Sequence, residues 1–144
     1  EKLIPITIYK ALRGESINLY GDGKNIREWL HVEDHVKALS LIAFEAQIGD
    51  TYCIGSGIEK TNRQIVSEIC DLLNILKPRR DSYHSLIRFT KDRKGHDYRY
   101  SIDSKKIKTN LKWSTNYSFE KGLKETVTWY IKNQEWCEKC LTKE

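Results

Sequence analysis

Five polar side chains in this sequence have the chemistry needed to hold an anion or a sugar: Lys2, Arg27, Asn62, Arg93 and His96. Arginine presents a rigid planar fork of N–H donors that matches the oxygens of a phosphate, while the other side chains add single donors. The same residues could equally form a solvated surface. Residue type alone therefore leaves a binding site and a plain polar surface both open.

Arg27 stands in the stretch around which the rest of the chain is organised. A strand-like run at 17–20 enters a glycine turn at 21–23, and a second run at 26–32 follows. The glycines supply the backbone freedom that a tight turn needs. Because the second run is largely apolar, we expect it to be buried. Arg27 should then have an anionic partner, since an unpaired buried charge is very costly.

A tyrosine and a lysine four residues apart can form a catalytic pair when a helix places them on one face, where the lysine lowers the pKa of the tyrosine. The sequence contains this spacing twice, as Tyr20 with Lys24 and as Tyr117 with Lys121. The first pair spans a glycine turn, and the second crosses a predicted helix start. We interpret both as coincidence.

Two glycine pairs, at 21–23 and 55–57, each resemble half of a dinucleotide-binding loop. Such a loop needs a third glycine at the point where a helix opens. Neither pair has that third glycine, so both are predicted to be turns.

The acidic pair at 33–34 is expected to serve the dipole of a helix start. His31 lies in the predicted strand, so a metal pair with His35 is not expected.

Cys137 and Cys140 form a CxxC, but no second pair or histidines follow at zinc-ligand spacing. We therefore predict no metal site.

Hydrophobic periodicity predicts alternating short strands and helices, which is typical of an α/β fold. The predicted strands are 17–20, 26–32, 51–54 and 86–90, with a short extended piece at 100–103. The predicted helices are 2–13, 33–47, 63–76, 104–111 and 119–132, with a last short helix around Trp136. The loop between the third helix and its following strand is placed at 79–85.

Two side-chain patterns indicate where the core should lie. Val36, Leu39, Ala43 and Ala46 share one face of the helix at 33–47, which we interpret as its core-facing side. Trp113 is predicted to anchor the core next to the helix that ends near 111.

Length and composition are typical of one soluble domain. The 144 residues are enough for a real core, and 39% hydrophobic with 31% charged residues suit a globular protein. No apolar run reaches the length of a membrane span, and no signal-peptide pattern is present. The net charge of +5 favours anionic ligands. Nucleic-acid binding is not predicted, because the sequence has no basic stripe interleaved with aromatic residues.

Cys53 and Cys70 are predicted to be buried free thiols, which favours a reducing cytoplasm.

Several longer motifs resemble the nucleotide-sugar dehydratases of the extended short-chain dehydrogenase/reductase family. They are EKLIP at 1–5, GDGKNIREWLHVEDHVKAL at 21–39, TYCIGSGIEKTN at 51–62, DRKGHDYRYSID at 92–103 and TVTWYIKNQEW at 126–136. These motifs stand in the family's order and at its separations. The resemblance covers nearly the whole chain and corresponds to the C-terminal part of such an enzyme.

The resemblance implies that residues 1–144 form a single segment, the C-terminal substrate-binding lobe of a Rossmann-type enzyme. The family's nucleotide-binding half would lie upstream of Glu1, with its tightly held NAD, its Tyr-Lys pair and its Asp-Glu pair. In the family, NAD takes hydride from C4 of the hexose, the acidic pair removes water across C5 and C6, and the hydride returns to C6. We therefore expect no catalytic residue in this chain, which alone should be inactive. The complete enzyme is expected to be a cytoplasmic homodimer.

The resemblance also implies a nucleotide-sugar site, with dTDP-glucose as the expected substrate. Arg27 would pair with the diphosphate, Tyr20 would offer its aromatic face to a base, and the loop at 92–96 would close over the ligand. The full set of implied substrate-binding residues is Lys2, Leu3, Asn18, Leu19, Tyr20, Arg27, Asn62, Asp92, Arg93, Lys94, Gly95 and His96.

Three positions depart from the family's usual residues. Lys94 replaces a proline, which loosens the loop and adds charge near a diphosphate; Cys53 replaces an asparagine and His31 a tyrosine. Two alternatives stay open at this point, a dehydratase or epimerase of a UDP-sugar and a non-catalytic nucleotide-sugar-binding module. The sequence upstream of Glu1 would discriminate between enzyme and module.

Overall fold

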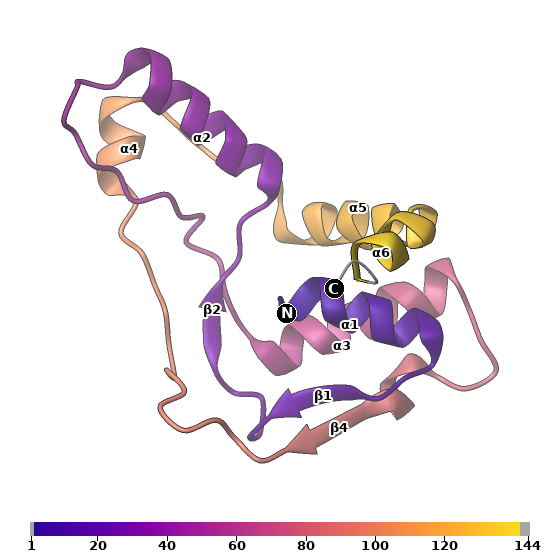
Figure 1. Ribbon diagram of the computed structural model, residues 1–144. Helices are drawn as coiled ribbons and strands as arrows, with labels where there is room; N and C mark the ends of the chain where they lie inside the picture. The colour runs from indigo at the N-terminus through magenta and orange to yellow at the C-terminus, as the bar shows by residue number, and fades with distance from the viewer. Residues whose placement is uncertain (1, 142–144) are drawn as a thin grey trace.

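The first helix follows its sequence signals closely in the computed structural model, which describes residues 2–141 (Figure 1). Helix α1 (Leu3–Arg13) begins after Lys2, and Pro5 falls in its first turn, where a missing N–H is tolerated. The helix ends at Gly14, whose φ of 71° is the left-handed conformation that glycine adopts without strain. The predicted helix at 2–13 is confirmed.

Two parallel strands form the sheet beside the predicted ligand site. Strand β1 (Ile17–Tyr20) pairs with β4 (Ile87–Thr90), and the register sets Tyr20 opposite Thr90. A parallel pair needs a long crossover connection, and helix α3 (Asn62–Leu76) lies within it. Figure 1 shows α1 and α3 lying on one side of this pair of strands.

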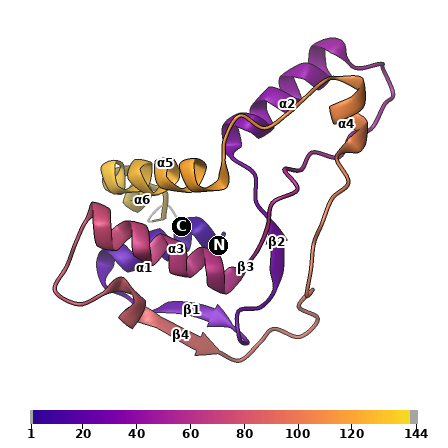
Figure 2. The ribbon, with the colours of Figure 1, turned by 180° about the vertical axis from the view of Figure 1, so that it is seen from behind.

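Helix α3 is the centre of the larger hydrophobic core. Thr61 and Gln64 form a reciprocal capping box at its start, and its apolar side is buried. Helix α1 and helix α5 (Phe119–Lys132) both contact α3, and α6 (Gln134–Leu141) follows α5 (Figure 2). The buried members of this core are Ile8, Ala11, Ile17, Leu19, Ile65, Val66, Ile69, Cys70, Leu73, Tyr83, Leu123 and Val127.

A smaller second core lies at the other end of the molecule. Helix α2 (Val32–Glu45) packs there beside the short helix α4 (Lys105–Asn110), and Trp113 is 2% exposed between them. The expectation that Trp113 anchors the core is confirmed. Figure 1 shows α2 and α4 standing apart from the group formed by α1, α3 and α5.

A short antiparallel ladder joins the two ends. Strand β2 (Ile26–Glu28) pairs with β3 (Glu59–Thr61), which the sequence analysis did not predict. The Glu28 carboxylate accepts the backbone N–H of Gly57 at 2.6 Å and that of Ile102 at 3.0 Å. One side chain therefore ties together two extended segments far apart in the sequence.

Asp34 has a different role from the one its position suggested. It is 1% exposed, and its carboxylate accepts the N–H of Asn116 at 2.8 Å and of Tyr117 at 3.1 Å. Its carbonyl oxygen also accepts the indole N–H of Trp113 at 3.1 Å. The prediction that this residue merely serves the helix dipole was incomplete, because Asp34 fixes the connection into α5.

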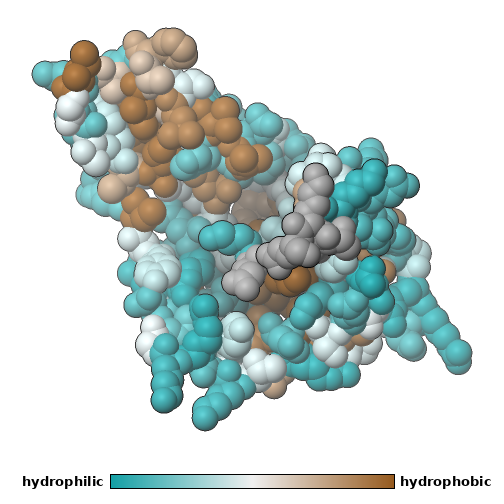
Figure 3. All heavy atoms as spheres, in the orientation of Figure 1, coloured by the Kyte–Doolittle hydropathy of each residue, from teal (hydrophilic) through white to brown (hydrophobic). Residues whose placement is uncertain are grey.

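The predicted core-facing side of α2 was wrong. Val36 is 51% and Leu39 49% exposed, and Ala43 is exposed as well, whereas the buried side carries Asp34 and Ala38. Of the four predicted residues only Ala46, at the end of the helix, packs against the second core. Figure 3 shows the resulting hydrophobic patch over the α2 end of the molecule. A helix that is apolar on two sides is typical of a helix covered on two sides. Within residues 2–141, only one of these sides is covered.

The predicted strand at 51–54 is also not formed. The segment is extended, and no strand pairing is present for it among the residues that the structure describes. Tyr52 and Ile54 pack against the second core, while Thr51 and Cys53 are exposed. The expectation of a buried Cys53 thiol was therefore wrong, and the β-forming sequence has no partner strand here.

Several element boundaries differ from the predictions. The second strand ends at Glu28 instead of Val32, and His31 caps α2 by accepting the N–H of Glu33 through Nδ1 at 3.3 Å. The predicted loop at 79–85 overlaps a 3-10 turn at Tyr83–Leu86.

No helix in the described part of the chain is long and apolar enough to span a bilayer.

Replacing the buried carboxylate tests the role assigned to Asp34. We expect Asp34→Ala to lower the free energy of unfolding by about 2–4 kcal/mol, because two partly buried N–H groups lose their acceptor at roughly 1–2 kcal/mol each, the lower part of the range for such a loss. Glu33→Ala, on the exposed side of the same turn, is the control and should change it by less than about 0.5 kcal/mol. Urea unfolding of the three proteins measures the difference, and equal losses in both variants would refute the assignment.

Candidate functional site

The β1–β4 ladder brings a turn and a loop together at the ends of the two strands. The N–H of Gly21 donates to the carbonyl of Thr90 at 2.9 Å, and the Thr90 hydroxyl donates to the carbonyl of Leu19 at 3.2 Å. Gly21 has a φ of 58°, and a Cβ there would lie 3.0 Å from Oδ2 of Asp92. Glycine thus serves both the turn and the close approach of the loop that follows Thr90.

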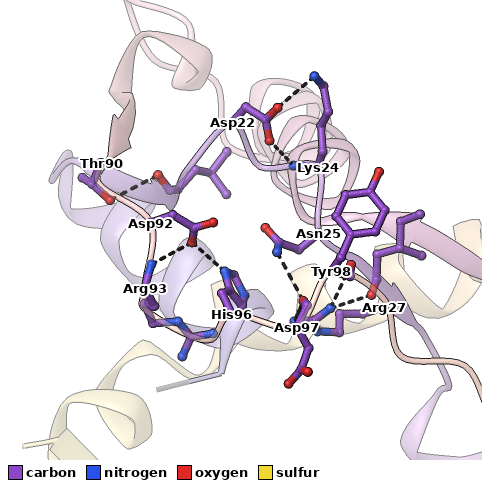
Figure 4. Close-up of polar contacts among 12 residues, drawn as sticks. Asp22, Lys24, Asn25, Arg27, Thr90, Asp92, Arg93, His96, Asp97 and Tyr98 are labelled. Atoms are coloured by element: carbon purple, nitrogen blue, oxygen red, sulfur yellow. Dashed lines mark hydrogen bonds and ion pairs between the residues drawn. The ribbon is translucent and has the colours of Figure 1, made fainter.

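Asp92 closes the loop at 92–96 on itself (Figure 4). Its Oδ1 accepts the N–H of Arg93 at 2.8 Å and lies 2.7 Å from Nδ1 of His96, whose side chain is only 4% exposed. These contacts, the His96 hydrogen bond foremost, lower the pKa of the Asp92 carboxyl below its ordinary value of 3.8. The loop therefore has a defined shape although nearly all of its residues are exposed.

Tyr20 lies against this loop at the end of β1. The ring of His96 meets it edge-on at a centroid distance of 6.3 Å, and the Arg93 guanidinium lies 5.0 Å from its centroid. Tyr20 is still 46% exposed. The structure thus brings Tyr20, Asp92, Arg93 and His96 into one group, as the sequence analysis expected.

Arg27 is adjacent to this group but is not buried as expected. It is half-buried and donates to three backbone carbonyls: Nη1 to Ile26 at 2.7 Å and to Tyr98 at 3.4 Å, and Nη2 to Asp97 at 2.9 Å. Its guanidinium also lies 4.4 Å from the centroid of the Tyr100 ring. The predicted charge partner is absent from the part of the chain that the structure describes. Carbonyls satisfy the hydrogen bonds without neutralising the charge.

The remaining predicted site residues are less closely placed. Asn62 opens α3, and its backbone N–H donates to Asn25 at 3.0 Å, which joins it to the Arg27 region. Asn18 is exposed on β1, whereas Leu19 is 2% exposed, so its side chain belongs to the core. Lys94 and Gly95 are exposed at the loop tip. Lys2 is exposed before α1, and Leu3 packs against the larger core.

Sequence reasoning missed four residues that build the surroundings of Arg27. They are Asn25, Asp97, Tyr98 and Tyr100. Asn25 donates from its side chain to the carbonyl of Asp97 at 3.3 Å. The sequence does contain a signal for this segment. Tyr98 and Tyr100 alternate, and alternate residues of an extended segment share one face, so the pattern predicts an extended segment with an aromatic side.

The alternative catalytic pairs do not have catalytic geometry. Lys24 pairs with Asp22 at 2.8 Å instead of with Tyr20. Lys121 does approach Tyr117, with Nζ 4.8 Å from the ring centroid. However, nearby carboxylates, chiefly Glu125, raise the pKa of Tyr117, which is the opposite of what an activated tyrosine needs.

The described residues do not fit a bound NAD. The glycine pair at 21–23 joins two strands, and the pair at 55–57 lies in a loop before β3, so neither opens a helix. Across residues 2–141, no group of three or more histidine, cysteine or acidic side chains could hold a metal ion. Cys137 is buried and Cys140 exposed, both as free thiols.

A small cavity lies away from the candidate site, between α1 and the starts of α2 and α5. It measures about 60 Å³, and the stacked rings of His31 and Tyr117, 3.9 Å apart, line one side of it. Pockets for small ligands usually measure roughly 300–1,000 Å³. This cavity is therefore too small for a nucleotide sugar.

A family model described as GDP-mannose 4,6 dehydratase matches residues 1–126. The chain belongs to this family. A dTDP-glucose 4,6-dehydratase of Escherichia coli is 46% identical over 138 residues, which cover 96% of this chain and 38% of that protein.

Two solved members of the dehydratase family have the same fold over nearly all of this chain. The Bacillus anthracis dTDP-glucose 4,6-dehydratase, in complex with NAD, superposes with a TM-score of 0.82 at 44% identity, covering 94% of this chain and 40% of that one. The enzyme of that name from Streptomyces venezuelae, with NAD and TYD bound, gives a TM-score of 0.85 at 41% identity, covering 94% of this chain and 40% of that one. The predicted α/β fold class is confirmed. The chain spans about two-fifths of the length of these relatives.

The pairing of Asp92 with His96 gives a prediction about pH. Because the pKa of Asp92 is lowered in the folded loop, the contact is fully present above the ordinary carboxyl range and is lost as the pH falls through the lowered value. We expect His96→Phe, which keeps a ring beside Tyr20 but removes the donor, to raise the Asp92 pKa toward 3.8. A titration of the Asp92 carboxyl carbon by NMR measures this shift.

The matched control uses another histidine–aspartate pair. His84 lies 2.8 Å from Asp71 and is remote from the loop at 92–96, so His84→Phe should leave the Asp92 titration unchanged. If Asp92 titrates at the same pH with and without His96, the closed loop geometry is wrong.

Proposed function

We propose that this chain is the nucleotide-sugar-binding lobe of a dTDP-glucose 4,6-dehydratase, which converts dTDP-glucose to dTDP-4-keto-6-deoxyglucose with NAD. One observation carries the proposal. The Arg27 guanidinium is held by three carbonyls and a ring instead of by a carboxylate. Its charge is therefore left for an anionic ligand, and the substrate diphosphate is such a ligand.

The surroundings of Arg27 suit the rest of a nucleotide diphosphate. Tyr20 offers partly exposed aromatic surface for a base, and Arg93 adds a second cation beside it. A stacked base would take the place that Arg93 now has over the ring. The choice of dTDP over UDP rests on the names of relatives that are 41–46% identical.

The uncovered surfaces support a lobe that belongs to a larger protein. The apolar side of α2, with Val36 and Leu39, and the unpaired extended segment at 51–54 lie next to each other along the chain. A helix followed by such a segment commonly packs on the sheet that the segment joins. We assign these surfaces to contact with the part of the longer relatives that this chain does not match.

This division assigns binding to the lobe and redox chemistry to the remainder. NAD, when bound in the remainder, supplies the hydride transfer, whereas Arg27 and the loop at 92–96 hold the diphosphate and restrict its access to water. We place residues 1–144 in one structural unit, the complete enzyme in a homodimer and both in the cytoplasm, where the free thiols at positions 53, 70, 137 and 140 would persist.

Removing the Arg27 side chain tests the proposal. We expect Arg27→Ala to weaken dTDP binding to the 144-residue chain by about 2 kcal/mol, the lower end of the range for a charged partner, because the guanidinium is only half-buried. Arg27→Lys should recover part of the loss, since an ammonium cannot make a planar two-point contact. Isothermal titration calorimetry with dTDP and with UDP measures both effects.

Arg99→Ala is the matched control for this experiment. Arg99 lies on the neighbouring segment but forms a two-point ion pair with Glu59, at 2.9 and 2.6 Å. Its loss should leave dTDP affinity within about twofold of the original, as expected for a surface ion pair. If Arg27→Ala binds dTDP as the original chain does, the proposed site is wrong. Tighter binding of UDP would move the assignment to a UDP-sugar enzyme.

A further inference from the structure

Backbone carbonyls occupy most of the N–H donors of the Arg27 guanidinium, and the contacts show which donors remain without an acceptor. A guanidinium has five N–H donors, two on each Nη and one on Nε. The three carbonyl contacts use both Nη1 donors and one Nη2 donor. Among the contacts of the described residues, the Nε–H and the second Nη2–H have no acceptor. Nε and Nη2 share one of the two guanidinium edges that can make parallel two-point contacts with phosphate oxygens. The other edge, between Nη1 and Nη2, already faces backbone carbonyls.

The guanidinium Cζ of Arg27 lies over the ring of Tyr100, 4.4 Å from the ring centroid. Such a contact attracts the cation to the ring and also restricts its plane. Three carbonyl hydrogen bonds orient the two Nη groups, and the ring adds a contact over the guanidinium that limits tilting of the fork. Preorganising a flexible side chain in this way reduces the ordering cost of binding.

Tyr100 is itself held in place from three directions. Its backbone N–H donates to the carbonyl of Ile26 at 3.2 Å, which pairs the segment with β2. Its phenol donates to the carboxylate of Asp97, and this hydrogen bond is the main reason that the pKa of Tyr100 is raised. The next residue back, Arg99, points the other way and pairs with Glu59. The ring is therefore part of a fixed support and not a free surface group.

We propose that Tyr100 is a positioning residue for nucleotide-sugar binding: its ring fixes the plane of the Arg27 guanidinium, so that the Nε–Nη2 edge is presented to the diphosphate. The diphosphate in this proposal rests on the proposed function; the support of Arg27 by Tyr100 does not. Asp97 assists through two groups, since its carboxylate holds the phenol and its carbonyl holds Nη2. Tyr100 thus acts on the ligand only through Arg27.

Three single variants of the 144-residue chain separate the ring from the hydroxyl and from general surface effects. Tyr100→Leu removes the ring, and Tyr100→Phe keeps the ring but loses the bond to Asp97. Phe89→Leu is the matched control, because Phe89 is a similarly exposed aromatic residue whose ring lies against Arg63 instead of Arg27. Amide spectra of each variant verify that the fold is retained.

The first readout needs no ligand. A proton stacked on an aromatic ring is shifted upfield, so the Nε–H signal of Arg27 reports the stack directly. We expect Tyr100→Leu to move this signal to the position of an unstacked arginine. Tyr100→Phe and Phe89→Leu should leave it near its original position. An unchanged signal in Tyr100→Leu would overturn the proposal.

The second readout is affinity for dTDP by calorimetry. We expect Tyr100→Leu to weaken binding about tenfold and Tyr100→Phe by no more than about threefold. Phe89→Leu should bind as the original chain does. In an Arg27→Lys background, Tyr100→Leu should cause little further loss, because the two residues act as one unit.

The outcomes distinguish this inference from the proposed function. An equal loss from Tyr100→Leu in the Arg27→Lys background would show that Tyr100 does not act through Arg27, and would overturn the inference. If the original chain binds no dTDP while the Nε–H signal responds as expected, the proposed function fails and the support of Arg27 by Tyr100 stands.

Discussion

The candidate site depends on the parallel pairing of β1 with β4. This pairing sets Tyr20 opposite Thr90 and brings the Gly21 turn within hydrogen-bond distance of the carbonyl of Thr90. The turn leads to Arg27, and the residues after Thr90 form the loop that Asp92 closes. Without the ladder, the two segments would be separated by about 70 residues of chain, and closing such a loop would have to be offset by other contacts.

The site uses backbone carbonyls where a buried salt bridge would be expected. Carbonyls of Ile26, Asp97 and Tyr98 satisfy the Arg27 donors but leave its positive charge in place. A carboxylate at the same position would compete with any anionic ligand. Around the loop at 92–96 a carboxylate takes part instead, because Asp92 is held by its contacts with His96 and with the backbone N–H of Arg93.

Much of the fold could be predicted from local signals. The proline and glycine at the ends of α1, the capping residue of α3 and the Ser118 cap of α5 each place a helix boundary within a residue or two. The predictions failed where the deciding partner is distant in sequence or absent from it. Asp34 finds its N–H donors at positions 116 and 117, and the surfaces of α2 and of 51–54 have no partner in residues 2–141. The apolar run around Arg27 also predicted burial with an anionic partner. The sequence pattern could not show that backbone carbonyls of Asp97 and Tyr98 satisfy its donors instead.

The central claim is that Arg27 presents an ordered, charge-unpaired edge to a diphosphate. A crystal structure of the chain with dTDP bound would test it most directly. The account predicts diphosphate oxygens within about 3 Å of both Nε and Nη2, with Tyr100 still stacked on the guanidinium. A diphosphate bound elsewhere, or held through the Nη1 donors after the carbonyl contacts are broken, would contradict it.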